Sequence, residues 1–262
     1  MTRHALPLTI ALGALAGALG GMMGVGGGLV LVPLLIHFLG ASQHEAQATS
    51  LAFVVATALV AAVPYLATER LDLPLAALLT AAAVPGVLVG VRVAKRTPGA
   101  QLRRAFGVVM LLAAIKLLAA PPEATVDTAV WAWPLNVLLG LGVGFFAGLL
   151  GVGGGTMLVP VLVLGERIPQ HVAQGISLIL IAPVGFIGAL SYARDGHVVK
   201  RALPGLLIGG AIGALLGALA AHRIEAPLLS RLFAILLVFV AAQMILRSPG
   251  ARAKSVSSGG VS

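Results

Sequence analysis

The sequence has no cysteine, few charged residues and few aromatic residues. The absence of cysteine excludes disulfides, thiolate chemistry and cysteine-ligated metal sites. Charged residues make up 10% of the chain, against about 25% in soluble domains, which is too few to cover a water-facing surface. Aromatic residues (5%) are not interleaved with basic ones, so the net charge of +9 does not indicate a nucleic-acid partner.

Long uncharged apolar runs take the place of a charged surface. Asp, Glu, Lys and Arg are all missing from residues 5–44, 46–68, 128–165 and 202–221. A helix that crosses a bilayer needs about 20 mostly apolar residues, so we predict an all-α polytopic membrane protein in the cell membrane, surrounded by lipid. The apolar N-terminus resembles a signal peptide, but we expect it to be retained, because the next motif recurs later in the chain.

The chain contains an internal repeat. Moving the sequence along itself by 127 positions aligns Gly24–Gly28 with Gly151–Gly155, and Gln47 and Ser50 with Gln174 and Ser177. The alignment holds without a gap over rare residue types, as expected for a duplicated transporter. The predicted organisation is a first transmembrane repeat, a linker, a second transmembrane repeat and a basic disordered tail, at residues 1–118, 119–130, 131–246 and 247–262.

Each repeat should begin with a long apolar segment that glycines interrupt, followed by three helices. We predict long segments at 5–40 and 131–165, and helices at 46–67, 73–92, 102–119, 170–193, 202–221 and 227–246. Each long segment is either a tilted, broken helix or a re-entrant hairpin. Hairpins divide Lys and Arg 12 to 5 between the two sides, whereas plain crossings divide them 9 to 8. The positive-inside bias therefore favours hairpins, inverted repeats and cytoplasmic termini.

The two glycine clusters are the strongest candidates for a site. A dense glycine run breaks a helix, and the half-helix that follows starts with unpaired N–H groups that attract anions. The alternative is close helix packing, as we expect for Gly17 with Gly21 and for Gly144 with Gly148. The predicted substrate-binding residues are Gly24, Gly26, Gly27, Gly28, Gln47, Ser50, Gly151, Gly153, Gly154, Gly155, Gln174 and Ser177.

The polar residues near these clusters have alternative interpretations. Gln47 and Gln174 could replace the hydration of a solute, or cap helices and bond between them. His44 and His171 could couple protons, but capping of the next helix is favoured. Tyr65 and Tyr192 are interpreted as interfacial belt residues rather than pore residues. We find no metal-ligand set, cofactor motif or nucleophile–base pair, which argues against an enzyme.

The doubled Gly-x-Gly-Gly-Gly, with a following Leu-Val-Pro and a later Gln-x-x-Ser, resembles the sulfite exporter TauE/SafE family of membrane transporters. The resemblance runs from about residue 6 to residue 246 and includes Pro33 and Pro160. It implies a secondary transporter for small anions, plausibly sulfite, thiosulfate or organosulfonates. A non-transporting membrane scaffold or assembly partner stays open as the alternative, and a homo-oligomer is compatible with either.

Overall fold

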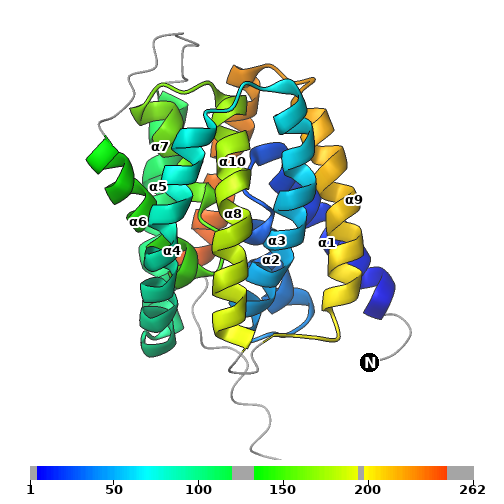
Figure 1. The fold of residues 1–262 in the computed structure, drawn as a ribbon. Helices are drawn as coiled ribbons and strands as arrows, with labels where there is room; N and C mark the ends of the chain where they lie inside the picture. The colour runs from blue at the N-terminus through cyan, green and yellow to red at the C-terminus, as the bar shows by residue number, and fades with distance from the viewer. Residues whose placement is uncertain (1–4, 120–132, 194–197, 247–262) are drawn as a thin grey trace, which may run out of the picture.

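The computed structural model describes residues 5–119, 133–193 and 198–246, and all regular structure in these ranges is helical (Figure 1). The ten helices described are α1 (Ala5–Met23), α2 (Gly28–Phe38), α3 (Gln43–Thr68), α4 (Leu73–Arg96), α5 (Gly99–Ala119), α6 (Trp133–Leu150), α7 (Gly155–Gly165), α8 (Gln170–Ala193), α9 (Leu203–Ala221) and α10 (Ala226–Leu246). The predicted tail and nearly all of the predicted linker lie outside the described residues.

Six of these helices are long and apolar enough to cross a membrane: α1, α3, α4, α6, α8 and α9. The polytopic helical membrane fold that the sequence predicts is confirmed. Among the predicted helix limits, α4 ends at Arg96 instead of residue 92 and α3 begins at Gln43 instead of residue 46. The early start of α3 comes from a capping box, in which Ser42 and Glu45 satisfy each other's backbone N–H groups. The cap is therefore Ser42, and the prediction that His44 caps this helix is wrong.

The chain reverses direction at both glycine clusters. The amides of Val25 and Gly26 donate back to the carbonyl of Gly20, and Gly27 packs on the backbone of Ala16. In a continuing helix, Gly27 would lie about 16 Å beyond Ala16. Gly154 likewise packs on Val143. Both long segments are therefore hairpins, and the tilted, broken helix is excluded.

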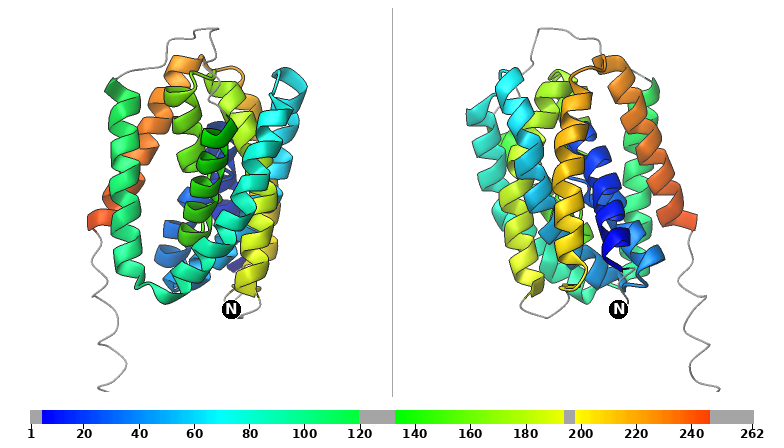
Figure 2. Two further views of the ribbon diagram at one scale, coloured as in Figure 1. Left: turned by 60° about the vertical axis from the view of Figure 1, so that its left-hand side comes forward. Right: turned by 90° about the vertical axis from the view of Figure 1, so that its right-hand side faces the viewer.

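The two halves run in opposite directions along the helix bundle. We name the end at which α1 begins the lower end, and the end at which α3 finishes the upper end (Figure 1). From the lower end, α1 rises, α2 returns, and α3, α4 and α5 cross in turn, whereas α6 starts at the upper end (Figure 2). These directions are those of an inverted pair; the repeat relation itself stays a prediction from the sequence.

Two helix pairs between the halves are packed through small residues. Gly13, Gly17 and Gly21 of α1 lie against the backbone of α9, and Gly209, Gly213 and Gly217 of α9 lie against α1. Gly140, Gly144 and Gly148 of α6 contact α4 in the same way. Without side chains at these positions the backbones can approach closely, which is how membrane helices gain packing energy. The packing role expected for Gly17, Gly21, Gly144 and Gly148 is confirmed.

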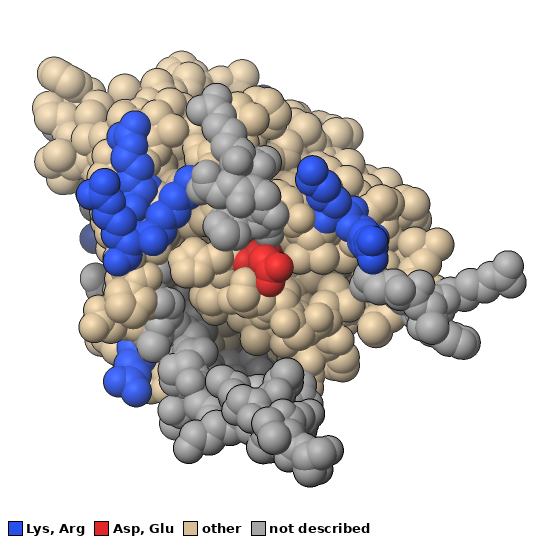
Figure 3. Space-filling view, turned by 90° about the horizontal axis from the view of Figure 1, so that it is seen from below, with Lys and Arg blue, Asp and Glu red and all other residues tan. Residues whose placement is uncertain are grey.

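The lower face is basic. Arg92, Lys95, Arg96, Lys200 and Arg201 lie at or near the lower ends of α4 and α9. Figure 3 shows this face with several Lys and Arg side chains around a single acidic patch. At the upper end, by contrast, the helix-connecting segments carry acidic residues beside fewer basic ones: Glu69, Asp72, Glu166 and Glu225 with Arg70, Arg167 and Arg223. The charge asymmetry expected from hairpins is therefore present between the described ends.

Candidate functional site

Each glycine turn ends in a residue that only glycine occupies without strain. Gly27 is the N-cap of α2 with φ of 82°, and Gly154 is the N-cap of α7 with φ of 87°. This left-handed region costs other residues roughly 1–2 kcal/mol. No side chain caps either helix, so the first N–H groups of both half-helices lack a side-chain acceptor. Both turns are buried throughout.

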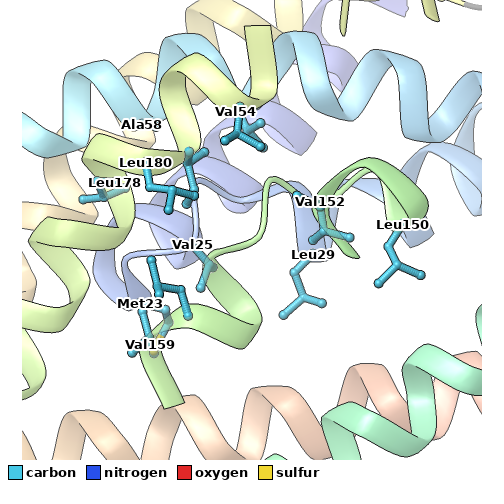
Figure 4. Close-up of a cluster of buried hydrophobic side chains, with 14 of the residues drawn as sticks. Met23, Val25, Leu29, Val54, Ala58, Leu150, Val152, Val159, Leu178 and Leu180 are labelled. Carbon is cyan, nitrogen blue, oxygen red and sulfur yellow. The ribbon is translucent and has the colours of Figure 1, made fainter. Parts of the chain in front are cut away.

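The two turns meet at the centre of the bundle (Figure 4). A carbon added at Gly26 would lie 3.3 Å from both Val54 and Ile181, and one added at Gly153 would lie within 3.3 Å of the same two residues. Val54 and Ile181 are at the middle of α3 and α8. The start of each half-helix also touches the opposite turn, since Gly28 lies beside the carbonyl of Val152 and Gly155 beside that of Gly24.

The two predicted glutamines cross over between the halves. Gln174 of α8 packs on Gly24 and donates to the carbonyl of Met22 (3.3 Å). Gln47 of α3 packs on Gly151 and donates to the carbonyl of Leu149 (3.3 Å). Each glutamine therefore satisfies a carbonyl at the end of the helix that precedes the other half's turn. Both are almost fully buried.

The two predicted serines stay within their own halves. Ser50 donates to the carbonyl of Gly28 (3.3 Å), and the hydroxyl of Ser177 lies beside Gly155. Sequence reasoning missed Thr57, whose hydroxyl donates to the carbonyl of Gly26 at 2.6 Å. A polar residue within an apolar run was its only signal, and the repeat hid it because the aligned residue is Val184.

Tyr65 is part of the site and is not a belt residue. Its side chain is fully buried, and its hydroxyl lies 3.1 Å from both the carbonyl of Gly21 and Oε1 of Gln174. Tyr192 is also fully buried. The interfacial interpretation of both tyrosines is therefore wrong. Trp133 is largely exposed at the start of α6, which agrees with an interfacial position, while Trp131 lies outside the described residues.

The site offers polar groups without a charged side chain. All the predicted site residues are glycine, glutamine or serine, and the structure brings the residues of both halves together. Among the described residues, Oε1 of Gln47 and the hydroxyl of Ser177 are buried without a hydrogen-bond partner. Buried polar atoms usually have partners, so both are available to a solute. The hydroxyl of Ser177 can donate to an anion, whereas Oε1 of Gln47 only accepts. Two helix N-termini add about half a positive charge each.

The predicted histidines occupy the two ends. His44 lies in the first turn of α3 at the lower end. His171 lies in the first turn of α8 at the upper end, and its Nε2 is 3.1 Å from the carbonyl of Ala221. It therefore caps the C-terminus of α9 and not the helix that contains it.

Residues 6–254 match the family described as sulfite exporter TauE/SafE. The chain belongs to this family. Among curated relatives of this TauE/SafE chain, a probable membrane transporter protein of Xylella fastidiosa is 30% identical over 95% of the chain and 98% of the relative. The probable membrane transporter protein YunE of Bacillus subtilis is 25% identical over 91% and 96%. No solved structure matches. Family and relatives together support a multi-pass membrane transporter.

Proposed function

We propose that this chain is a secondary carrier for small anions, and that the anion binds between the two glycine turns. The observation that carries the proposal is the meeting of two half-helix N-termini at the bundle centre, in a setting without acidic side chains. Backbone N–H groups and helix dipoles attract negative charge there. Irregular backbone at membrane depth is tolerated where it is buried in protein or lines a cavity, and both turns are buried.

The family name adds a substrate class to this proposal. Sulfite, thiosulfate and small organosulfonates are compact anions with several acceptor oxygens. Such oxygens can accept hydrogen bonds from N–H groups and from the hydroxyl of Ser177, which has no partner among the described residues. In the conformation described, both turns are buried, which is how a carrier holds its site when neither end is open. Movement of one half against the other would open the ends in turn.

The test is anion flux into proteoliposomes that carry the purified protein, with labelled sulfite, thiosulfate, sulfate and a small sulfonate. Ser177→Ala and Gln47→Leu remove polar groups at the turns with little change in size. We expect at least one anion to show saturable flux. Ser177→Ala should reduce this flux about tenfold, because one hydrogen bond to a charged group contributes about 1.5–3 kcal/mol. Gln47→Leu should reduce it because the carbonyl of Leu149 at the second turn loses its donor. Thr80→Val, which removes a hydroxyl on α4, is the matched control and should keep full flux.

Two outcomes contradict the proposal. Flux that Ser177→Ala and Gln47→Leu leave unchanged would place the anion site elsewhere. Absence of flux for every anion, from protein that is folded and inserted, would favour the scaffold or a carrier of another solute class. The membrane assignment does not depend on either outcome.

A further inference from the structure

A cluster of aromatic and titratable side chains closes the upper end above the glycine turns. The imidazole of His222, which follows α9, lies 4.6 Å from the ring of Tyr65 and 5.7 Å from that of His171, between ring centroids. Its Nε2 is 3.9 Å from Oε1 of Glu69. Side chains from α3, α8 and α9 therefore meet at His222, and these helices come from both halves of the chain.

The hydrogen bonds of the two imidazoles identify one free nitrogen. Nδ1 of His222 is 2.7 Å from the carbonyl of Ala218. A carbonyl oxygen only accepts, so Nδ1 carries the hydrogen. Nε2 of His171 likewise carries a hydrogen toward Ala221. Nε2 of His222 is buried and has no hydrogen-bond partner among the described residues. In the neutral ring this atom holds a lone pair, directed to the side where Glu69 lies.

We propose that Nε2 of His222 is a proton-binding site, and that its proton holds the upper end of the carrier closed. A charged imidazolium would form an ion pair with Glu69 and face the electron-rich ring of Tyr65. Both interactions strengthen when the imidazole becomes positive. They exist only while α3 and α9 are packed together at this end. Protonation therefore stabilises the closed arrangement over any arrangement in which these helices separate.

At the lower end, a permanently charged lysine takes the place that His222 has beside Tyr65 at the upper end. The repeat offset that aligns Tyr65 with Tyr192 also aligns His222 with Lys95. Nζ of Lys95 lies 5.6 Å from the centroid of the Tyr192 ring, within the range of a cation–π contact. The same position thus holds a fixed charge at one end and a histidine at the other. Histidine is the side chain that changes charge between pH 5 and 8, so only the upper contact can respond to protons.

The cluster is joined directly to the proposed anion site. The hydroxyl of Tyr65 contacts Oε1 of Gln174, and Gln174 packs on Gly24. Separation of α3 from α9 would therefore break the chain of contacts that runs from His222 through Tyr65 and Gln174 to the first glycine turn. The proton-binding role deepens the proposed carrier function and rests on it, because closure matters only if a solute passes this end.

Several other charged side chains lie at the upper end and could add to a pH response. The turn of His222 carries Arg223 and Glu225, the loop after α3 carries Arg70 and Asp72, and α7 ends at Glu166. Helix α1, which packs along α9, has no titratable side chain. The test must therefore separate the effect of His222 from the effects of these groups. Comparing the labelling rates of two proteins that differ only at His222 does this.

The experiment measures access to the first turn without any substrate. The chain has no cysteine, so Val25→Cys introduces a single thiol at a fully buried position. The protein is placed in lipid nanodiscs, and labelling by a maleimide is timed between pH 5.5 and 8. Each rate is divided by the rate of the same cysteine in a His222→Gln background, which cancels the pH dependence of the thiol. Val152→Cys serves as the lower-end reference, and His37→Gln as a histidine control at the lower end of α2.

At pH 8 we expect the same rate with and without His222→Gln. At pH 5.5 the protein that keeps His222 should label roughly three- to tenfold more slowly, the effect of a partly desolvated cation–π contact and ion pair. His222→Lys should be slow at every pH. His37→Gln should leave the response intact, and Val152→Cys should show no slowing at low pH.

A ratio that stays constant with pH at Val25→Cys would overturn the proton-binding site, and so would an equal slowing at Val152→Cys. Neither result would affect the anion proposal, which rests on the flux measurement. Conversely, a clear pH response in a protein that moves none of the tested anions would keep the proton site and remove the proposed substrate class.

Discussion

Glu166 is a fully buried carboxylate that the anion site does not use. It caps the C-terminus of α7, and both of its oxygens lack a hydrogen-bond partner among the described residues. Burial, with a smaller contribution from the nearby Asp72 carboxylate, raises the pKa of Glu166 from an ordinary 4.5 to about 7. The folded protein therefore holds a proton here over a range in which the unfolded chain has already released it.

The consequence is a loss of stability as the pH rises. Between about pH 4.5 and 7 the folded state binds more protons at Glu166 than the unfolded state, so the free energy of unfolding falls across this range. Glu166→Gln removes the titration while it keeps the shape. We expect the variant to have a flatter dependence of Tm on pH between 5 and 7, and a higher Tm than the parent at pH 8. Thermal unfolding in detergent at several pH values measures both, and parallel curves for the two proteins would contradict the assignment.

Residue-level reasoning from the sequence singled out residues that the structure brings together at the two turns, but it did not find their partners. Gln47 and Gln174 were identified because they recur, yet each lies on the turn of the opposite half. Proximity in the sequence suggests that each glutamine lies at the glycine turn of its own half. Only the antiparallel packing of the two halves shows that each lies at the turn of the other half. Tyr65 was misassigned for a related reason: tyrosines near helix ends are common at membrane interfaces, and the sequence does not show that α9 covers this one.

At the scale of helices, the contact of α1 with α9 depends on missing side chains. A carbon at Gly17 would collide with the backbone of Gly210, and a backbone cannot rotate away as a long side chain can. Overpacking of this kind costs about 1–3 kcal/mol. Gly142 of α6 provides the contrast, because a carbon added there meets nothing within 4 Å.

Gly17→Ala should therefore lower the Tm of the protein in detergent, whereas Gly142→Ala should leave it unchanged or raise it slightly, since alanine favours helix over glycine by about 1 kcal/mol. The two variants make the same chemical change in helices of the same kind. Equal effects would show that helix propensity outweighs the contact between α1 and α9.

Helix positions were predictable to within a few residues because the apolar runs and charged loops define them. The start of α3 was missed because local hydrogen bonds set it: the capping box at Ser42 starts this helix three residues before the apolar run. The choice between a broken helix and a hairpin needed the charge count, and the structure decides it through contacts such as Gly27 on Ala16. Apolar periodicity alone does not distinguish the two.

For the whole molecule, the hairpins determine which loops share a side. The loop after α2 and the loop between α4 and α5 both lie at the lower end, and the loop between α3 and α4 lies at the upper end (Figure 1). With the basic end in the cytoplasm, Gly40→Cys and Pro98→Cys should react with an impermeant reagent only after cells are opened. Arg70→Cys should react in intact cells.

Labelling of Gly40→Cys and Pro98→Cys from opposite sides would exclude the hairpin arrangement in the membrane. Labelling of both from outside would keep the hairpins and reverse the orientation. Because the chain has no native cysteine, each variant reports a single position.

The contact between α1 and α9 also has a consequence for the order of events during synthesis. Helix α1 leaves the ribosome long before α9, which is the partner of its glycine face. Until α9 is made, that face has only lipid beside it, and the turn that follows α1 lacks the glutamine of α8 on which it rests. A chain that stops before α9 therefore lacks the contact between α1 and α9, and one that stops before α8 also lacks Gln174 at the first turn. Assembly at both places waits for the synthesis of α8 and α9, so a product truncated before these helices should be short-lived rather than partly active.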